Sequence, residues 1–173
     1  MINGGIFGPK LSGKTTLAMA LSRQYWQQQK IKTVVLDING DNWGEHATAT
    51  ADEEIFWQVV WKAQNCLIIV DEAAETIKRD KKLIPVFTRM RHNNHKLIVI
   101  GHSGMNLLPI MREQLDTIYL FRQGEKAAAY WSETMAEKQL LQACELPQYV
   151  FIHYELYGKA ERQKLALPKV SPA

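Results

Sequence analysis

The segment GPKLSGKTT near the start of the chain constrains the fold more than any other part of the sequence. It follows a short apolar run at 2–7 and precedes a stretch at 14–29 in which apolar residues recur at helical spacing. Glycines let backbone N–H groups surround phosphate oxygens, a lysine reaches the outer phosphates, and a hydroxyl can hold Mg²⁺. Gly8, Gly13, Lys14 and Thr15 provide these groups in that order.

The segment therefore predicts a phosphate-binding loop between a strand and a helix. The alternative is a simple glycine turn that joins the two elements. In the phosphate-binding interpretation, the nucleotide contacts come from Gly8, Pro9, Lys10, Leu11, Ser12, Gly13, Lys14, Thr15 and Thr16.

A second motif is the apolar run CLIIVDE at 66–72, which closes with two carboxylates. Because the carboxyl ends of parallel strands meet at one edge of a sheet, we expect Asp71 beside the loop, where it can hold Mg²⁺ through water. Glu72 would then polarise the attacking water. An acidic pair after a strand can also simply cap a helix, but its combination with the loop favours catalysis. The adjacent glutamate indicates hydrolysis rather than transfer to an acceptor.

Apolar runs alternate with helical stretches along the rest of the chain. Further strands are expected at 33–39, 66–71, 96–101, 117–122 and 148–158, and further helices at 52–64, 79–93, 107–115 and 132–145, the last capped by Ser132. The strand runs are continuously apolar, which predicts burial on both faces. The pattern favours an α/β fold with a mostly parallel central sheet flanked by helices. We expect one domain at 1–158 and a basic tail at 159–173 that forms an arm or is partly disordered.

Composition sets limits on the class of protein. A chain of 173 residues with 46% hydrophobic and 23% charged residues is typical of one globular domain. Its longest apolar runs are only about five residues, against the roughly 20 of a membrane span. The two cysteines fit no metal-binding spacing. A formal charge of +3 is too mild to indicate a nucleic-acid partner by itself.

With these motifs, the chain resembles the FtsK/HerA superfamily of P-loop motor ATPases. The stretch VLDINGD at 35–41 resembles the acidic turn that follows the second strand in that superfamily. RHNNHKLIVIGH at 91–102 resembles its arginine placed eleven residues before a polar strand end. IMREQLDTIYLF at 110–121 resembles its short helix followed by a strand, and the segment from Ser132 to 151–152 resembles the end of small viral packaging ATPases.

The resemblance implies a RecA-like P-loop NTPase core and an ATPase motor that depends on Mg²⁺. It further implies a ring of identical subunits, a pentamer or a hexamer, that translocates double-stranded DNA. The size of the chain is similar to that of the viral packaging members, which move a genome into a preformed capsid. Viral capsid vertex proteins are then expected as partners, with no direct membrane span. The protein would act in the host cytoplasm or at the packaging vertex of the virion.

The resemblance also implies catalytic roles at the phosphates. Lys14 matches the lysine that reaches the outer phosphates. His102 stands where the superfamily usually has a glutamine, and there it would sense the γ-phosphate, with Ser103 as the alternative sensor. A histidine that is merely hydrogen-bonded in the structure is the competing interpretation.

Four arginines are candidates for a role across the subunit boundary, Arg112 and Arg122 being the weaker two. Arg91 is the first candidate for an arginine finger that reaches a neighbouring subunit's nucleotide, a contact that can supply about 10³–10⁵ in rate. Arg89 is the second candidate, and two positions apart on a helix the pair cannot share a face. Surface ion pairing is the alternative for both. Arg112 and Arg122 are expected to be solvated.

Two further features have both a structural and a functional interpretation. Trp57 and Trp61 form an aromatic stripe on an apolar helix, which indicates core packing or, alternatively, an inter-subunit surface. The charged run KRDKK at 78–82 indicates a solvated face or, in a ring, a pore lining that follows DNA phosphates.

Three alternative functions stay open. One is an assembly and export ATPase similar to the Zot proteins of filamentous phages, which normally carry a membrane anchor. Another is a nucleoside kinase, since the loop and Asp71-Glu72 also resemble thymidine kinases, although the Cys-x-x-Cys zinc motif usual in those enzymes is absent from this sequence. The third is a nucleotide-gated switch without turnover, which Glu72 disfavours.

Overall fold

The computed structural model describes residues 3–71 and 90–167. The strands are β1 (Asn3–Phe7), β2 (Thr33–Leu36), β3 (Ala47–Thr50), β4 (Leu67–Val70), β5 (Lys96–Gly101), β6 (Thr117–Leu120), β7 (Val150–Glu155) and β8 (Glu161–Lys164). The α-helices are α1 (Lys14–Gln29), α2 (Glu53–Lys62), α5 (Pro109–Arg112) and α6 (Glu125–Thr134). The 3₁₀ helices are η2 (Met90–Asn93), η3 (Gly104–Asn106) and η4 (Lys138–Glu145).

One sheet organises the described residues, with eight strands in the order β3-β2-β4-β5-β1-β6-β7-β8. The pairs from β3 through β6 are parallel, and β7 and β8 extend the β6 edge with antiparallel pairs. The prediction of a mostly parallel sheet flanked by helices is therefore confirmed. None of the helices in the described ranges is both long and apolar enough to cross a bilayer.

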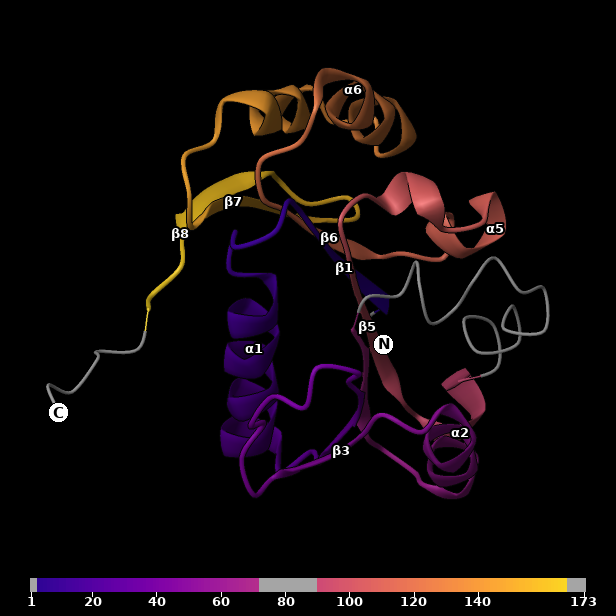
Figure 1. The fold of residues 1–173 in the computed structure, drawn as a ribbon. Helices are drawn as coiled ribbons and strands as arrows, with labels where there is room; N and C mark the ends of the chain where they lie inside the picture. The colour runs from indigo at the N-terminus through magenta and orange to yellow at the C-terminus, as the bar shows by residue number, and fades with distance from the viewer. Residues whose placement is uncertain (1–2, 72–89, 168–173) are drawn as a thin grey trace, which may run out of the picture.

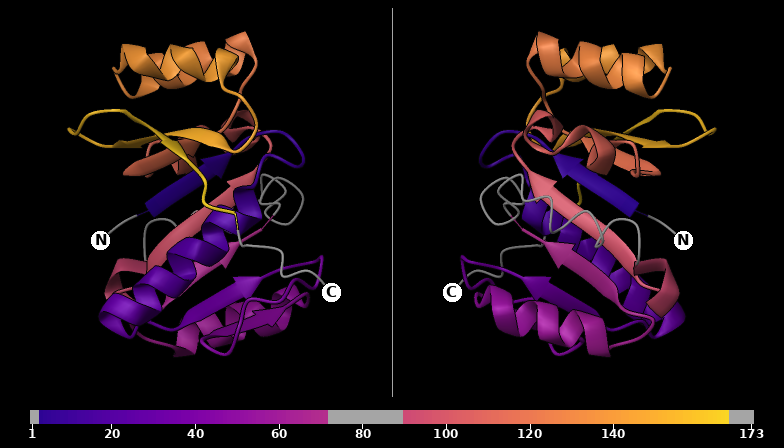
Figure 2. Two further views of the ribbon diagram at one scale, coloured as in Figure 1. Left: turned by 90° about the vertical axis from the view of Figure 1, so that its left-hand side faces the viewer. Right: turned by 90° about the vertical axis from the view of Figure 1, so that its right-hand side faces the viewer.

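Helices cover both faces of this sheet (Figure 1). Helix α1 packs on one face, and α2, α5, α6 and η4 pack on the other. Alternate residues of a strand enter opposite layers, so Ile68 and Val70 contact the α2 side while Leu67 and Ile69 contact the α1 side. This two-sided burial is the reason for the continuous apolar runs in the sequence. The left view of Figure 2 shows α1 in front of the sheet, running along the direction of the strands behind it.

The predicted helix at 132–145 is wrong. The structure divides this region into α6 and η4, and Ser132 lies buried inside α6 instead of capping a helix. Ala136 breaks the chain direction with a left-handed backbone (φ 52°), and the Glu137 side chain then caps η4 by accepting a hydrogen bond from the Gln139 N–H. Helix α6 begins at Glu125, seven residues before the expected start at Ser132.

Two strands at the edges of the sheet, β3 and β8, were not predicted. Strand β3 pairs with β2, and β8 pairs with β7. The sequence of β8 is ERQK with all four residues exposed, so backbone hydrogen bonds rather than an apolar pattern hold it. Residues 161–164 therefore belong to the sheet and not to the arm that we expected at 159–173. The greater part of the helix expected at 79–93 lies outside the described residues, which include only η2.

The two tryptophans of α2 have different surroundings. Trp57 is half-buried and packs against the core, whereas Trp61 is 44% exposed, with a ring centroid 6.5 Å from that of Trp57. Core packing therefore accounts for Trp57 only. The charged run at 78–82 lies outside the described residues.

Neighbouring positions on α2 allow a direct test of the core. Phe56 is fully buried, whereas Ile55 is 51% exposed. We expect Phe56→Ala to lower the free energy of unfolding by about 3–5 kcal/mol, because it removes a packed ring and leaves a cavity. Ile55→Ala is the matched control and should cost less than about 1 kcal/mol. Urea denaturation measures both values, and equal losses would contradict this packing.

Candidate nucleotide-binding site

The glycine loop joins the carboxyl end of β1 to the start of α1. The Gly8 N–H donates to the Gly101 carbonyl at 3.2 Å, and Gly13, with φ 101°, is the N-cap of α1. A Cβ at Gly8 would lie 2.6 Å from Phe121 Cβ, and one at Gly13 would lie 2.6 Å from Leu165 Cδ2. Gly8 thus requires glycine for space, and Gly13 requires it for its left-handed backbone. The N-terminus of α1 points at the loop, which is the arrangement that binds phosphate.

Lys14 is the first residue of α1, and its side chain folds back over the loop. Its side chain is buried, and its ammonium group donates to the Pro9 carbonyl at 3.0 Å. The charge is therefore held directly over the loop backbone, within reach of any anion that the loop binds.

Thr15 and Asp71 meet at this edge of the sheet, as their predicted shared role as metal ligands requires. The Thr15 hydroxyl donates to Asp71 Oδ2 at 3.2 Å across 56 positions of sequence. Asp71 follows β4, is 1% exposed, and its N–H donates to the Leu36 carbonyl at 3.0 Å. A hydroxyl and a carboxylate side by side form a donor set that suits Mg²⁺.

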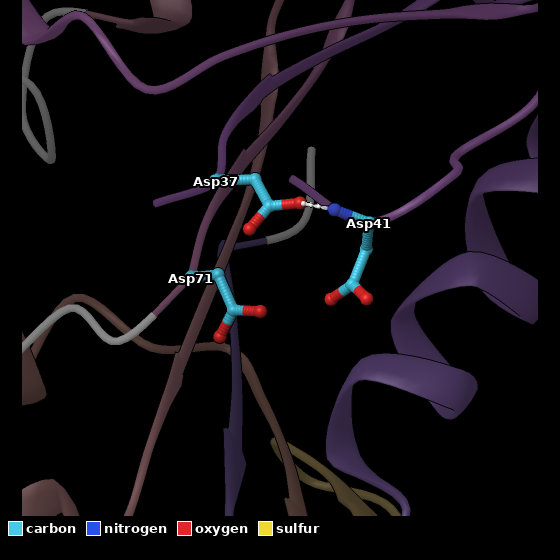
Figure 3. A group of neighbouring side chains, drawn as sticks. All are labelled: Asp37, Asp41 and Asp71. Atoms are coloured by element: carbon cyan, nitrogen blue, oxygen red, sulfur yellow. Dashed lines mark hydrogen bonds between the residues drawn. The ribbon is translucent and has the colours of Figure 1, made fainter. Parts of the chain in front are cut away.

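Two further carboxylates lie beside Asp71 (Figure 3). Carboxylate oxygens of Asp37, Asp41 and Asp71 all lie within 4.8 Å of one another. Asp37 is buried, and it accepts hydrogen bonds from the Asp41 N–H at 2.7 Å and from Trp43 Nε1 at 2.9 Å. Partial burial raises the pKa of the Asp41 carboxyl, and the negative charge of Asp37 raises this pKa further.

Asp37 and Asp41 were not predicted as site residues, although the acidic turn at 35–41 that contains them stood out in the sequence. The available signal was an acidic residue directly after an apolar strand, the same signal that identified Asp71. Strands β2 and β4 are paired in parallel, so their carboxyl ends bring these acids together.

The other predicted site residues have different placements. His102 and Ser103 follow β5 at the same edge as the loop, and the Ser103 hydroxyl accepts from the Met105 N–H. Arg91 lies in η2, before the amino end of β5 and hence toward the opposite edge of the sheet. Glu72 and Arg89 lie outside the described residues.

The prediction that Arg112 is exposed to solvent is wrong. We expected it in solvent, but it is 8% exposed and its guanidinium lies 4.4 Å from the centre of the Tyr130 ring. The stacking on Tyr130 explains the burial, since a guanidinium is attracted to the face of an aromatic ring. Arg122 is exposed, as expected.

The chain also matches a known family of nucleotide-binding proteins, as the geometry of the loop suggests. A family model, the ATPase family associated with various cellular activities (AAA), matches residues 5–122. The chain belongs to this AAA family. It is a P-loop ATPase, and ATP hydrolysis is its reaction class. Among curated protein sequences, none matches the chain.

Solved structures show the same fold at low sequence identity. The genome packaging NTPase B204 from Sulfolobus turreted icosahedral virus 2, in complex with sulfate, has a TM-score of 0.80 at 21% identity, over 96% of this chain and 97% of that one. The N-terminal domain of zonular occludens toxin from Neisseria meningitidis has a TM-score of 0.61 at 12% identity, over 98% and 96% of the two chains. Both show that the fold is shared.

Gly13 provides a test of the loop. We expect Gly13→Ala to abolish measurable ATP binding, because a side chain at this φ strains the backbone and meets Leu165. Gly44→Ala is the control, since Gly44 also has a positive φ (83°) and also faces one side chain, His46. Isothermal titration with ATP should show binding within about threefold of the native value for the control, a change below about 1 kcal/mol. Retained ATP binding by Gly13→Ala would contradict this role of the loop.

Proposed function

We propose that this ATPase uses Mg²⁺-dependent ATP hydrolysis to translocate double-stranded DNA, and that it packages a viral genome into a preformed capsid. The observation that carries the hydrolysis part of the proposal is the contact between Thr15 and Asp71 beside a loop that requires glycine at positions 8 and 13. The fold is also that of a protein described as the DNA-packaging ATPase from Sulfolobus turreted icosahedral virus. We place its action in the host cytoplasm or the virion.

Each site residue has a proposed part in the reaction. Residues 8–16 surround the phosphates, and Lys14 moves its ammonium from the Pro9 carbonyl to the outer phosphates. Thr15 and Asp71 would hold Mg²⁺, which neutralises charge on the β- and γ-phosphates when bound. Glu72 polarises the attacking water, and His102 senses the γ-phosphate from the end of β5.

The geometry favours an arginine that acts between subunits. Arg91 precedes β5, whereas the loop follows β1, and β1 and β5 run parallel. Arg91 and its own loop therefore lie toward opposite edges of one sheet. A neighbouring subunit in a ring is the natural recipient of this arginine, with Arg89 as the alternative. We propose a homo-oligomeric ring, pentameric or hexameric, that acts with capsid vertex proteins.

A second candidate function is assembly or export of filamentous phage. The similarity to the N-terminal domain of zonular occludens toxin, which extends over 98% of this chain, favours it. Both candidates are P-loop motors, so they differ in the partner rather than in the chemistry.

ATP hydrolysis with and without duplex DNA tests the proposed function. We expect added duplex DNA to raise the rate of phosphate release, because translocation couples turnover to DNA contact. Parallel reactions with thymidine should give no phosphorylated nucleoside. A rate that is indifferent to DNA would contradict DNA translocation, and thymidine phosphate would indicate a kinase instead.

A mixing experiment tests the arginine. Glu72→Gln and Arg91→Ala should each lower turnover by about 10²–10⁴ while ATP binding persists. Mixed rings should regain activity, because an Arg91→Ala subunit that keeps Glu72 can use the arginine of a Glu72→Gln neighbour. Arg89→Ala is tested in the same way, and Glu54→Gln, an exposed position on α2, is the control. No recovery in either mixture would contradict an arginine in trans.

A further inference from the structure

A cavity of about 420 Å³ lies between α1 and the part of the sheet formed by β6, β7 and β8. Its volume falls within the range of small-molecule sites, about 300–1,000 Å³. Successive turns of α1 form one wall, and the face of the three strands that looks toward α1 forms the other. Both walls are regular elements, so the side chains that line the cavity are held on a rigid frame.

The acidic end of this cavity lies away from the glycine loop. Glu155 pairs with Thr117 at the start of β6, whereas the loop follows the end of β1. Because β1 and β6 run parallel, these two positions lie toward opposite edges of the sheet. None of the described residues that we assign to the nucleotide lines the cavity. The cavity is therefore separate from the nucleotide-binding site.

Three aromatic rings line the cavity. Tyr25 comes from α1, Tyr119 from β6 and Phe151 from β7. The centroid of the Tyr119 ring lies 5.9 Å from that of Phe151, and Tyr119 also stacks on His153, with centroids 4.5 Å apart. Aromatic faces attract cations. The ammonium group of Lys96 already lies 5.7 Å from the centre of the Tyr25 ring, which shows this attraction within the chain.

The described residues that line the cavity include one carboxylate, Glu155, and neither lysine nor arginine. The Glu155 side chain is 62% exposed, and its Oε1 lies 3.6 Å from His153 Nε2. Burial lowers the pKa of the His153 imidazole, although the charges of Glu155 and Glu161 act in the opposite direction. The imidazole is then largely uncharged at pH 7. The lining therefore carries a net negative charge.

The charge of Glu155 reaches the hydroxyl groups of both tyrosines. Burial raises the pKa of Tyr25, and Glu155 raises it further. Burial, followed by the charges of Tyr25 and Glu155, raises the pKa of Tyr119 to about 12. Within the described part of the chain, no lysine or arginine forms a salt bridge with Glu155. A cationic ligand would supply the missing counter-ion.

Glutamine side chains contribute hydrogen-bond acceptors to the same cavity. Gln24 and Gln28 lie one turn apart on α1, and Gln163 comes from β8. Gln163 Nε2 donates to Glu161 Oε2 at 3.3 Å, so its Oε1 is the atom that can accept from a ligand. A guanidinium has five N–H donors and no acceptor, and it is flat enough to stack on an aromatic ring. This cation therefore suits a lining of amide oxygens, tyrosine rings and one carboxylate.

We propose that this cavity binds a guanidinium group, with Glu155 as its counter-ion and the rings of Tyr25 and Tyr119 as the surfaces on which it packs. A free small molecule or an arginine side chain from a second copy of this chain can carry the group. The proposal does not depend on ATP hydrolysis, because the cavity and the loop share no assigned residue.

Butylguanidinium and butylurea, which has nearly the same shape but no charge, test the proposal. The full chain is titrated with each compound while amide NMR spectra are recorded. We expect butylguanidinium to bind in the millimolar range and to shift signals of α1 and of residues 150–155. Butylurea should bind at least about 10-fold more weakly, since it cannot form a charge-assisted hydrogen bond.

Glu155→Gln should weaken the binding of butylguanidinium at least about 10-fold, and its exposed position makes loss of the fold an unsuitable explanation. Glu133→Gln removes an exposed charge from α6, on the other face of the sheet, and should leave the affinity unchanged. Equal affinities for the two compounds, signal shifts confined to other parts of the chain, or full affinity in Glu155→Gln would each overturn the site.

Sedimentation of the native chain and of Glu155→Gln at several concentrations distinguishes the two sources of the guanidinium. If an arginine of a second copy occupies the cavity, the native chain should associate at lower concentration than the Glu155→Gln variant does. If a free molecule is the ligand, the two chains should have the same mass at every concentration, and the NMR titration alone then carries the site.

Discussion

The parallel direction of six adjacent strands, from β3 through β6, is the constraint on which the candidate site depends. Their carboxyl ends meet at one edge, so segments that are distant in sequence leave the sheet close together. Only β5 separates β4 from β1, which brings Asp71 within hydrogen-bonding distance of Thr15. That hydrogen bond contributes about 1 kcal/mol net, whereas the buried strands on either side contribute far more. The core therefore maintains the geometry of the site.

The convergence of strand ends also places three carboxylates close enough to repel one another. Asp37, Asp41 and Asp71 approach one another within 4.8 Å, and two of the three are buried. Asp37 accepts hydrogen bonds from the Asp41 N–H and from Trp43 Nε1, and partial burial, followed by the charge of Asp37, raises the pKa of the Asp41 carboxyl. A raised carboxyl pKa means that the folded chain holds a proton there more readily than the unfolded chain does. A divalent cation would relieve the same repulsion.

The elements with a strong local pattern were predictable from the sequence. The bounds of α1 and of β5 agree with the expected ranges 14–29 and 96–101, because the glycine loop marks the start of α1 and a continuous apolar run marks β5. Strand β8 could not be predicted from the sequence, because its four residues are polar and exposed and it is held by backbone hydrogen bonds alone. The burial of Arg112 depends on Tyr130, a contact between α5 and α6 that no local pattern indicates. Glu72, Arg89 and the Arg91 side chain keep their predicted roles as proposals.

Leu165 shows how far along the chain the loop finds its support. It is 6% exposed, it occupies the space beside Gly13, and its N–H donates to the Tyr149 carbonyl at 2.8 Å. Gln148 supports Leu11 in a similar way. During synthesis, residues 8–16 emerge well before these neighbours. A nascent chain thus gains the complete shape of its loop only after residues 148–165 have been made, so nucleotide capture before that point is disfavoured.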